Sequence, residues 1–295
     1  MKRAARTLAD ALEHGLSGMA TRSPRIALAL GDGVGRLRNR LSGRWPSPDE
    51  VQALFPALAR HEAARIASRI GGVEARSRIV VECLGAPGAS LSQSLVPRAP
   101  AEIARLQAPL ILGFFHVGAF QALGAVLECL PGPVLAFRHR LLTESRAPLT
   151  ILSTEGNDQE RAAVFLRAFS HLGAGGFVAT ALDEVPGQGL RVPLLGRSVE
   201  LARGPFALSR LSGAPLIPLV ARWHGGTVTA EVGEPLTAVR SSDPGTRELE
   251  QATAAALWID GYLRKSPEEI GLGLLRRLVQ SPAGPSAISG PAPSS

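Results

Sequence analysis

From Pro109 onward, short apolar runs of strand length alternate with stretches of helical periodicity. The apolar runs predicted as strands are residues 110–115, 134–138, 149–152, 177–182, 216–223 and 227–232. Helices are expected between them over residues 118–130, 157–171, 203–212 and 245–264. Because strands that alternate with helices form largely parallel sheets, we predict a single-domain α/β fold. Its mostly parallel or mixed central sheet would be flanked by helices.

The chain before Pro109 is predicted to be helical. Residues 1–41 indicate one or two amphipathic helices, with Leu8, Leu12, Leu16 and Met19 at helical spacing among several arginines. This pattern fits a helix in the headgroup layer of a membrane and equally a helix packed on its own domain. Ser47-Pro48-Asp49-Glu50 is a capping-box sequence that predicts a helix to about Ile70, before Gly71-Gly72. A further helix is expected over residues 73–85.

A second capping-box sequence, Ser266-Pro267-Glu268-Glu269, predicts the last helix of the chain. After about Ser281 the residues are Pro, Gly, Ser and Ala, which indicates a disordered tail. We therefore divide the chain into an N-terminal amphipathic helical segment (1–46), an α/β domain (47–280) and a tail (281–295).

The chain is basic, with a formal net charge of +7 and a pI near 10.7. A basic, mildly apolar protein suits anionic partners such as a membrane surface or an acidic carrier protein, although a solvated arginine surface explains the charge as well. No zinc spacing, RNP-like aromatic run or dense Lys/Arg block is present, so we expect no nucleic acid partner. The two cysteines, Cys83 and Cys129, define no disulfide framework, and no stretch approaches the roughly 18 apolar residues of a membrane span.

The segment Pro109–His116 is an apolar strand that ends in a histidine, and a predicted helix follows it. The carboxyl ends of parallel strands are where α/β sheets place catalytic groups. In a His-plus-acid pair the imidazole removes a proton from a hydroxyl, and the acid holds the other ring nitrogen. The residue five positions after His116, one turn into the helix, is Gln121.

A strand ending in His, with an acid five residues later at a helix start, is the signature of the lysophospholipid acyltransferase superfamily. The chain resembles its bacterial lipid A biosynthesis (lauroyl/myristoyl) branch over about residues 30–278. Four further pieces carry the resemblance, in the expected order: Phe137-Arg138; Asp183 after a strand; Val192–Gly196 with Arg203-Gly204; and Leu263–Glu269 with Arg276-Arg277.

The resemblance implies that His116 is the general base and Gln121 its orienting partner. Arg138 would contact a phosphate or an acidic headgroup, and Asp183, Arg203 and Gly204 would belong to the substrate-binding residues. Gln121 departs from the family pattern, because a glutamine accepts a hydrogen bond but carries no charge; in a serine-protease triad this exchange costs about 10⁴ in rate. Asp183 or Glu184, after a neighbouring strand, could instead approach His116.

The expected function is transfer of a fatty acyl group to a hydroxyl of a lipid, glycolipid or lipid-like acceptor. The donor would be an acyl-carrier-protein or coenzyme A thioester. We expect a peripheral protein at the cytoplasmic face of the inner membrane, without a cofactor or a metal. The alternative is a catalytically impaired homologue that binds lipids or acyl groups, or acts as a scaffold.

Overall fold

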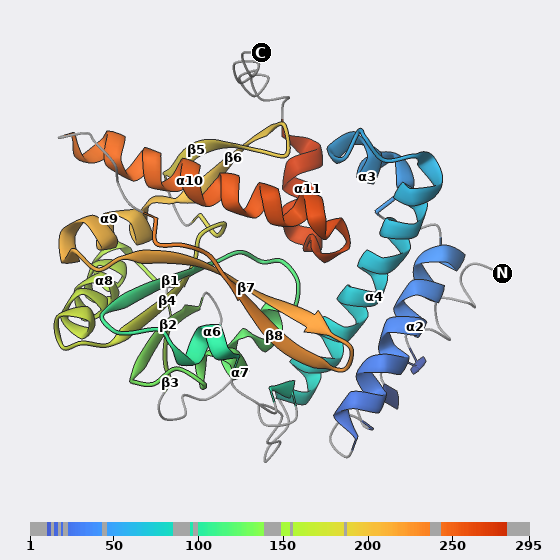
Figure 1. Cartoon of the computed structure of the whole chain (residues 1–295), viewed down its shortest axis with the longest axis horizontal. Coiled ribbons are helices and arrows are strands. Elements are labelled where there is room, and N and C mark those ends of the chain that lie inside the picture. The colour runs from blue at the N-terminus through green and yellow to red at the C-terminus, as the bar shows by residue number, and fades with distance from the viewer. Residues whose placement is uncertain are drawn as a thin grey trace, which may run out of the picture.

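The computed structural model describes residues 23–42, 46–84, 95–96, 100–138, 149–153, 156–185, 188–236 and 243–281, together with residues 11, 12, 15, 16 and 19. It is an α/β structure with a mostly parallel sheet between helices, as the sequence predicted (Figure 1). The predicted tail after Ser281 and the first ten residues lie outside the described part of the chain.

The central sheet has six strands in the order β3-β2-β4-β1-β7-β8. Its strands are β1 (Leu110–Phe114), β2 (Val134–Arg138), β3 (Leu149–Ser153), β4 (Phe177–Ala181), β7 (Leu216–His224) and β8 (Thr227–Val232). All neighbouring pairs are parallel except β7 and β8, which form an antiparallel hairpin at one edge. Each of the six predicted strands is therefore confirmed.

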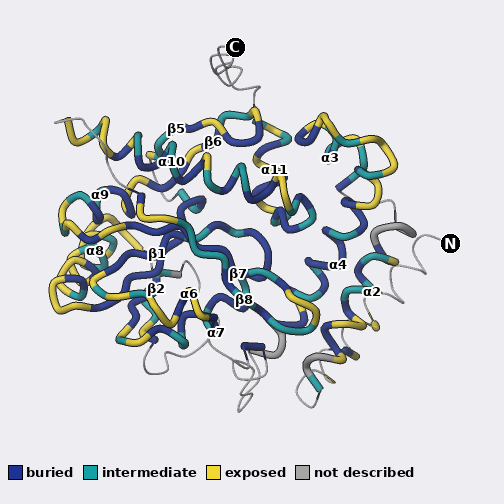
Figure 2. The backbone as a smooth tube through the Cα atoms, in the orientation of Figure 1, coloured by how far each residue is buried: buried dark blue, intermediate teal, exposed yellow. Residues whose placement is uncertain are grey.

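Both faces of the sheet are covered by helices. Side chains along a strand point alternately to the two faces, so each face has its own hydrophobic cluster. In β1, Ile111 belongs to one cluster and Leu112 to the other. The first cluster contains residues of α8 (Asp158–Gly173), α9 (Arg203–Ser212), α10 (Pro244–Lys265) and α11 (Leu272–Gln280). The second contains residues of α6 (Ala101–Ala104), η1 (Phe120–Ala122) and α7 (Leu123–Leu127) on the opposite face (Figure 1). The inner strands β1 and β4 are accordingly almost fully buried, while the edge strands β3 and β8 are partly exposed and the outer turns of the helices are exposed (Figure 2).

Two helices, α2 (Pro24–Ser42) and α4 (Arg60–Leu84), pack along each other at the end of the sheet near the β7–β8 turn (Figure 1). The expected helix break at Gly71-Gly72 is wrong, since α4 continues through both residues. Gly71 lies where α4 crosses α2. The helices are so close here that a Cβ added to Gly35 of α2 would lie only 2.2 Å from the carbonyl oxygen of Gly71. Small residues at this crossing let the two backbones approach, and tertiary contact overrides the low helix propensity of glycine.

The helix predicted from Ser47 is present with its capping box, but it is short. Helix α3 (Pro48–Leu54) ends before Phe55, and α4 begins only at Arg60. The other predicted capping box, at Ser266, is wrong: residues Pro267–Glu269 form a 3₁₀ turn, η2, without a side-chain cap. The Glu269 carboxylate is bound to the Tyr262 hydroxyl instead, and α11 starts at Leu272.

A two-stranded hairpin, β5 (Gly189–Leu194) with β6 (Arg197–Ala202), lies outside the central sheet and was not predicted as strands. Its turn, Leu195-Gly196, has positive φ at both residues, which is typical of a type I′ turn. The Leu195 amide donates to Asp260 of α10 at 2.6 Å, which ties the hairpin to that helix. Within the described residues, no helix is both long and apolar enough to cross a membrane.

Candidate functional site

His116 follows β1 and Asp183 follows β4, its parallel neighbour in the sheet. The register pairs Phe114 with Ala181, so the residues two positions later, His116 and Asp183, leave the sheet side by side. Strand geometry therefore brings together two side chains that are 67 positions apart in the chain.

The His116 ring is held by the Asp183 carboxylate. The distance between His116 Nδ1 and Asp183 Oδ1 is 2.8 Å, and the His116 amide donates to the same oxygen at 3.2 Å. An ionised carboxylate only accepts hydrogen bonds, so Nδ1 carries the proton and Nε2 has a free lone pair when the ring is neutral. The Asp183 side chain is 1% exposed and that of His116 is 29% exposed, so the ring has access to solvent.

The rings of Phe114 and Phe120 flank the imidazole edge-on. Their centroids lie 6.0 Å and 4.7 Å from that of His116. These apolar rings leave the imidazole only part of its surface for solvent, and they restrict the orientations that it can adopt.

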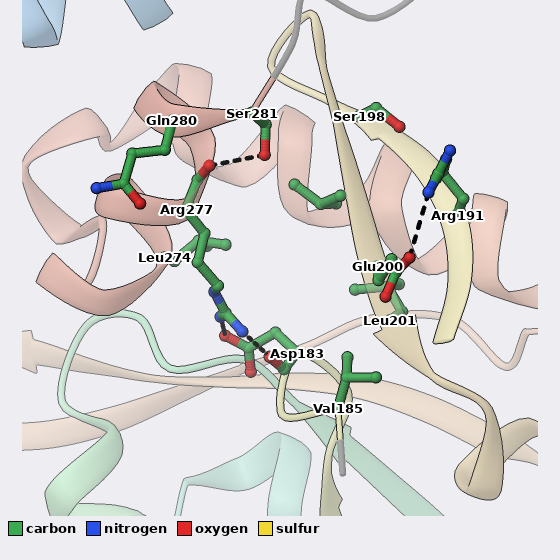
Figure 3. Close-up of a pocket in the computed structure, with 11 residues that line it drawn as sticks. Asp183, Val185, Arg191, Ser198, Glu200, Leu201, Leu274, Arg277, Gln280 and Ser281 are labelled. Carbon is green, nitrogen blue, oxygen red and sulfur yellow. Dashed lines mark hydrogen bonds and ion pairs between the residues drawn. The ribbon is translucent and has the colours of Figure 1, made fainter. Parts of the chain in front are cut away.

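The second oxygen of Asp183 is bound by Arg277 of α11. The distance from Arg277 Nη2 to Asp183 Oδ2 is 2.7 Å, and Nη1 of the same guanidinium donates to the Asp183 carbonyl oxygen. Figure 3 shows the arginine side chain extending from α11 to the aspartate. The three side chains form a row in which the carboxylate lies between a histidine and an arginine.

The surroundings shift the pKa values of both members of the pair. Burial opposes the charge of His116, but the Asp183 carboxylate and its hydrogen bond outweigh burial and raise the pKa of the imidazole above its usual value. Burial also opposes the charge of Asp183, but His116 and then Arg277 favour it and lower the pKa of that carboxyl. The aspartate is therefore ionised at neutral pH, and the histidine is a stronger base than a free imidazole.

The backbone after His116 is fixed by hydrogen bonds at each amide. Besides the His116 amide, Val117 donates to Phe115 at 2.8 Å, and Gly118 and Ala119 donate to the carbonyls of Glu269 and Ala221, both at 2.7 Å. Gly118 has a φ of 61°, and a Cβ on it would lie 2.4 Å from the Ala221 carbonyl oxygen. Only glycine fits this turn, which sets the direction in which His116 leaves the sheet.

A second buried carboxyl, Glu269, lies beneath the His116 loop. The Tyr262 hydroxyl donates a hydrogen bond to Glu269 Oε2, and Arg222 Nε lies 3.7 Å from Glu269 Oε1. Burial raises the pKa of Glu269, although the Tyr262 hydrogen bond and Arg222 oppose the shift. Next to it, Arg69 of α4 pairs with Glu268 at 3.2 Å. The η2 turn thus connects the His116 loop to α4 and α10.

A pocket of about 590 Å³ lies between the β5–β6 hairpin and α11, with Asp183 and Arg277 in its wall (Figure 3). The remaining lining mixes charged, polar and apolar side chains: Val185, Arg191, Ser198, Val199, Glu200, Leu201, Leu274, Gln280 and Ser281. Solvent in this pocket reaches the face of Arg277, whose side chain is 45% exposed.

The structure separates the predicted site residues into different groups. Asp183, expected among the substrate-binding residues, is the partner of His116. Gln121, expected to orient His116, does not make that hydrogen bond, and its Oε1 is buried without a hydrogen-bond partner among the described residues. Arg138 is the last residue of β2, next to β4, and its side chain lies outside the described part of the structure.

Arg203 and Gly204 open α9 close to the pair, because Ala202 donates to the Leu182 carbonyl at 2.7 Å. The Arg203 guanidinium is bound by the buried Glu248, with Nε 2.6 Å from Oε2, so it takes part in a contact between α9 and α10. Gly204 is exposed on the first turn. Neither residue contacts His116 or Asp183 in the hydrogen bonds and ion pairs of the described chain.

Sequence reasoning missed Arg277 and Glu269 as members of the site. Both lie in the segment whose resemblance to the acyltransferase branch was noted, but no local pattern indicated what they contact. A buried acid at one strand end calls for a basic partner, and this requirement could have directed attention to the Arg276-Arg277 pair.

Comparison with known proteins assigns the chain to no family: no protein-family model matches it, and no curated protein matches its sequence. Among the described residues, no group of three His, Cys, Asp or Glu side chains is placed to hold a metal ion.

Proposed function

We propose that the protein is an acyltransferase that moves a fatty acyl group from a thioester to a hydroxyl of a lipid, glycolipid or lipid-like acceptor. The observation that carries the proposal is the 2.8 Å contact between His116 Nδ1 and Asp183 Oδ1 at the carboxyl ends of two parallel strands. A carboxylate on Nδ1 fixes the tautomer and leaves Nε2 to take a proton. The ordered resemblance to the lipid A acyltransferase branch supports acyl transfer as the reaction.

The chemistry follows from the free ring nitrogen. The acceptor oxygen attacks the thioester carbonyl carbon while His116 Nε2 takes the hydroxyl proton. As the new C–O bond forms and the C–S bond breaks, the imidazolium returns this proton to the departing sulfur. The products are an ester and a free thiol. Asp183 stays ionised throughout and stabilises the imidazolium that forms between the two proton transfers.

Asp183 supplies the negative charge that Gln121 lacks. A glutamine at the family's acidic position argues for an impaired homologue if that position must supply the charge. Here the charge comes from the end of the adjacent strand, already bound to the ring. This arrangement favours the enzyme over the alternative, a lipid-binding or scaffolding protein.

The partners follow from charge and surface. A net charge of +7 suits an anionic membrane and an acidic acyl carrier protein; coenzyme A, also anionic, is the other donor. On α2, one face packs against α4 through residues such as Leu28, while Ile26, Leu30 and Leu37 are 57%, 48% and 54% exposed. Their spacing places these three apolar side chains on one exposed stripe, which supports peripheral attachment to a membrane surface. The cytoplasmic face of the inner membrane is the location that the proposed reaction implies.

The test is thiol release from a panel of acyl-carrier-protein and coenzyme A thioesters, with membrane lipid extract as the acceptor. We expect release that depends on the acceptor and that disappears in His116→Ala. The matched control is His224→Ala, which removes an exposed histidine at the end of β7. If no thioester turns over, or if His116→Ala is as active as the control, the enzyme proposal is wrong. Lipid binding without turnover would favour the alternative.

A further inference from the structure

Asp183 is bound on both of its oxygens, and the two partners differ in kind. Oδ1 accepts hydrogen bonds from His116, while Oδ2 accepts one from Arg277. The same guanidinium also donates to the Asp183 backbone carbonyl. A planar group that holds both the side chain and the main chain of one residue fixes the plane of its carboxylate.

Helix α11 is anchored so that Arg277 points to this position. Leu274, Leu275 and Leu278 are each no more than 1% exposed and attach the helix to the core. At the end of the helix, the Ser281 hydroxyl donates to the Arg277 carbonyl at 2.7 Å. The direction of the arginine side chain is therefore set by a helix that has little freedom to move.

We propose that Arg277 is a positioning residue of the catalytic pair, which turns Asp183 so that Oδ1 faces the His116 ring. This inference rests on the proposed function, because it concerns the same site. Without the arginine, a carboxylate can rotate about its Cβ–Cγ bond and exchange its oxygens, and His116 loses a fixed partner. Arg277 touches neither the histidine nor a reacting atom, so it acts through Asp183.

The charge of Arg277 gives a signal that a purely packing role does not produce. Its guanidinium opposes protonation of His116 and thereby limits how far the pKa of the imidazole is raised. Arg277→Met removes this charge but keeps an apolar side chain of moderate length. Removal of the charge alone raises the pH at which His116 titrates, whereas a freed Asp183 carboxylate that turns away from the ring lowers it. We therefore expect His116, followed by NMR of the imidazole ring, to titrate at a different pH in Arg277→Met than in the wild type.

Activity separates the charge of Arg277 from its geometry. Arg277→Lys keeps a positive charge but lacks the planar fork that holds both the carboxylate and the backbone carbonyl of Asp183. We therefore expect the rate of thiol release to fall about tenfold while the His116 titration changes little. For Arg277→Met the expected loss in rate is on the order of 10- to 100-fold.

The adjoining pocket provides a rescue experiment. Arg277→Ala would join the space of the missing side chain to the pocket of about 590 Å³ in which Arg277 stands. Guanidinium chloride, well below unfolding concentrations, should then restore part of the rate and return the His116 titration toward that of the wild type. Sodium chloride at the same concentration controls for ionic strength. Arg191→Met is the matched variant, because Arg191 lines the same pocket but is bound to Glu200 and not to Asp183.

Unchanged titration of His116 in folded Arg277→Met, together with a rate equal to that of Arg191→Met, would overturn the proposal. The ring titration needs no substrate, so it tests Arg277 even if no thioester turns over, and the two proposals can fail separately. If the variants at position 277 do not fold, the guanidinium NMR signals of wild-type Arg277 still decide. The chemical shifts of these signals should differ between the wild type and Asp183→Asn, because the substitution removes the charged acceptor of Arg277. Identical chemical shifts in the two proteins would also overturn the proposal.

Discussion

Two buried carboxylates, Asp183 and Glu248, look alike by burial and differ in what they can do. Each side chain is 1% exposed and each is bound by two basic residues. Glu248 of α10 accepts from Arg203 at 2.6 Å and from Arg210 at 3.0 Å, and both arginines belong to α9. Asp183 accepts from one arginine, Arg277, and from a histidine.

The difference lies in the partner that can lose its proton. Both partners of Glu248 are guanidinium groups, which do not act as proton donors or acceptors in a reaction, and they hold α9 to α10. An imidazole changes its charge near neutral pH, so the Asp183 cluster has two charge states. Burial and pairing alone thus do not distinguish a structural acid from a site; the chemistry of the partner does.

The largest effect is expected for Asp183→Asn on the rate of acyl transfer. An amide keeps the shape but cannot stabilise the imidazolium and can impose the wrong tautomer, which in serine proteases costs about 10⁴ in rate. Thiol release measured against the wild type gives the loss. Asp158→Asn, at an exposed position on α8, is the control and should retain the wild-type rate. A loss below tenfold would mean that Asp183 is a structural acid like Glu248.

Glu248→Gln should affect stability and not catalysis. The substitution removes the negative charge and leaves one acceptor oxygen for two arginines, Arg203 and Arg210, which can still reach solvent because they are partly exposed. We expect a loss of about 1–3 kcal/mol in the free energy of unfolding, measured by urea denaturation. The rate of the folded protein at low temperature should stay at the wild-type value. A large drop in rate without a change in stability would contradict the structural role of this cluster.

The two charge states of the Asp183 cluster predict a pH dependence. The rate should rise about tenfold per pH unit on the acid side, until the neutral imidazole predominates above the raised pKa of His116. In Asp183→Asn this acid limb should move to lower pH. A profile that is flat through this range would show that His116 is not the base.

The same shifts set the sign of the effect on stability. Because the pKa of His116 is higher in the folded than in the unfolded protein, protonation of His116 stabilises the fold. This stabilisation is complete at pH values below the pKa of the unfolded state and is lost as pH rises through the pKa of the folded state. The lowered pKa of Asp183 contributes stability that is complete above its unfolded value and is lost as pH falls through the folded one. The charge pair is therefore most stabilising at mildly acidic pH, between the two transitions.

The smallest effect is expected for Gln121→Glu. If the residue five positions after His116 supplied the missing charge, this substitution would accelerate the reaction. Because Asp183 already holds Nδ1, we expect no gain in rate, and burial should keep the new carboxyl protonated. A destabilisation of about 1 kcal/mol is the typical cost at such a position. A marked acceleration would show that Asp183 does not supply the charge in the working enzyme.

The fold was more predictable than the site, because strands and helices follow from the local pattern of apolar and polar residues. The six central strands follow from apolar runs, and α8, α9 and α10 lie close to the helices expected between them. Where local patterns failed, tertiary contacts decided: Gly71-Gly72 signals a helix end but serves the packing of α2 on α4. The β5–β6 hairpin was not predicted, because proline is unusual within a strand, as at Pro193, and leucine is unusual in the left-handed conformation that Leu195 adopts in the turn.

The site depended on contacts across the chain, which one sequence does not encode locally. His116 could be recognised because its signal is local, a histidine at the end of an apolar strand. Its partner was expected to be Gln121, with Asp183 or Glu184 as the alternative, because the order of the strands was unknown. The parallel pairing of β1 with β4 selects Asp183. Arg277 arrives from a helix 94 positions further along, and nothing in its neighbourhood predicts its contact.

If the protein transfers acyl groups as proposed, the hydrogen-bonded backbone after His116 limits which groups can stabilise the tetrahedral intermediate. All amides from His116 to Ala119 already donate hydrogen bonds, so this loop offers no N–H group to an oxyanion. Breaking one of these bonds would disturb the turn that aims the imidazole. The negative charge on the former carbonyl oxygen must therefore be met by donors outside the loop. Mutation of candidate side-chain donors around the His116 ring would therefore show whether side chains or the backbone of another segment supply this stabilisation.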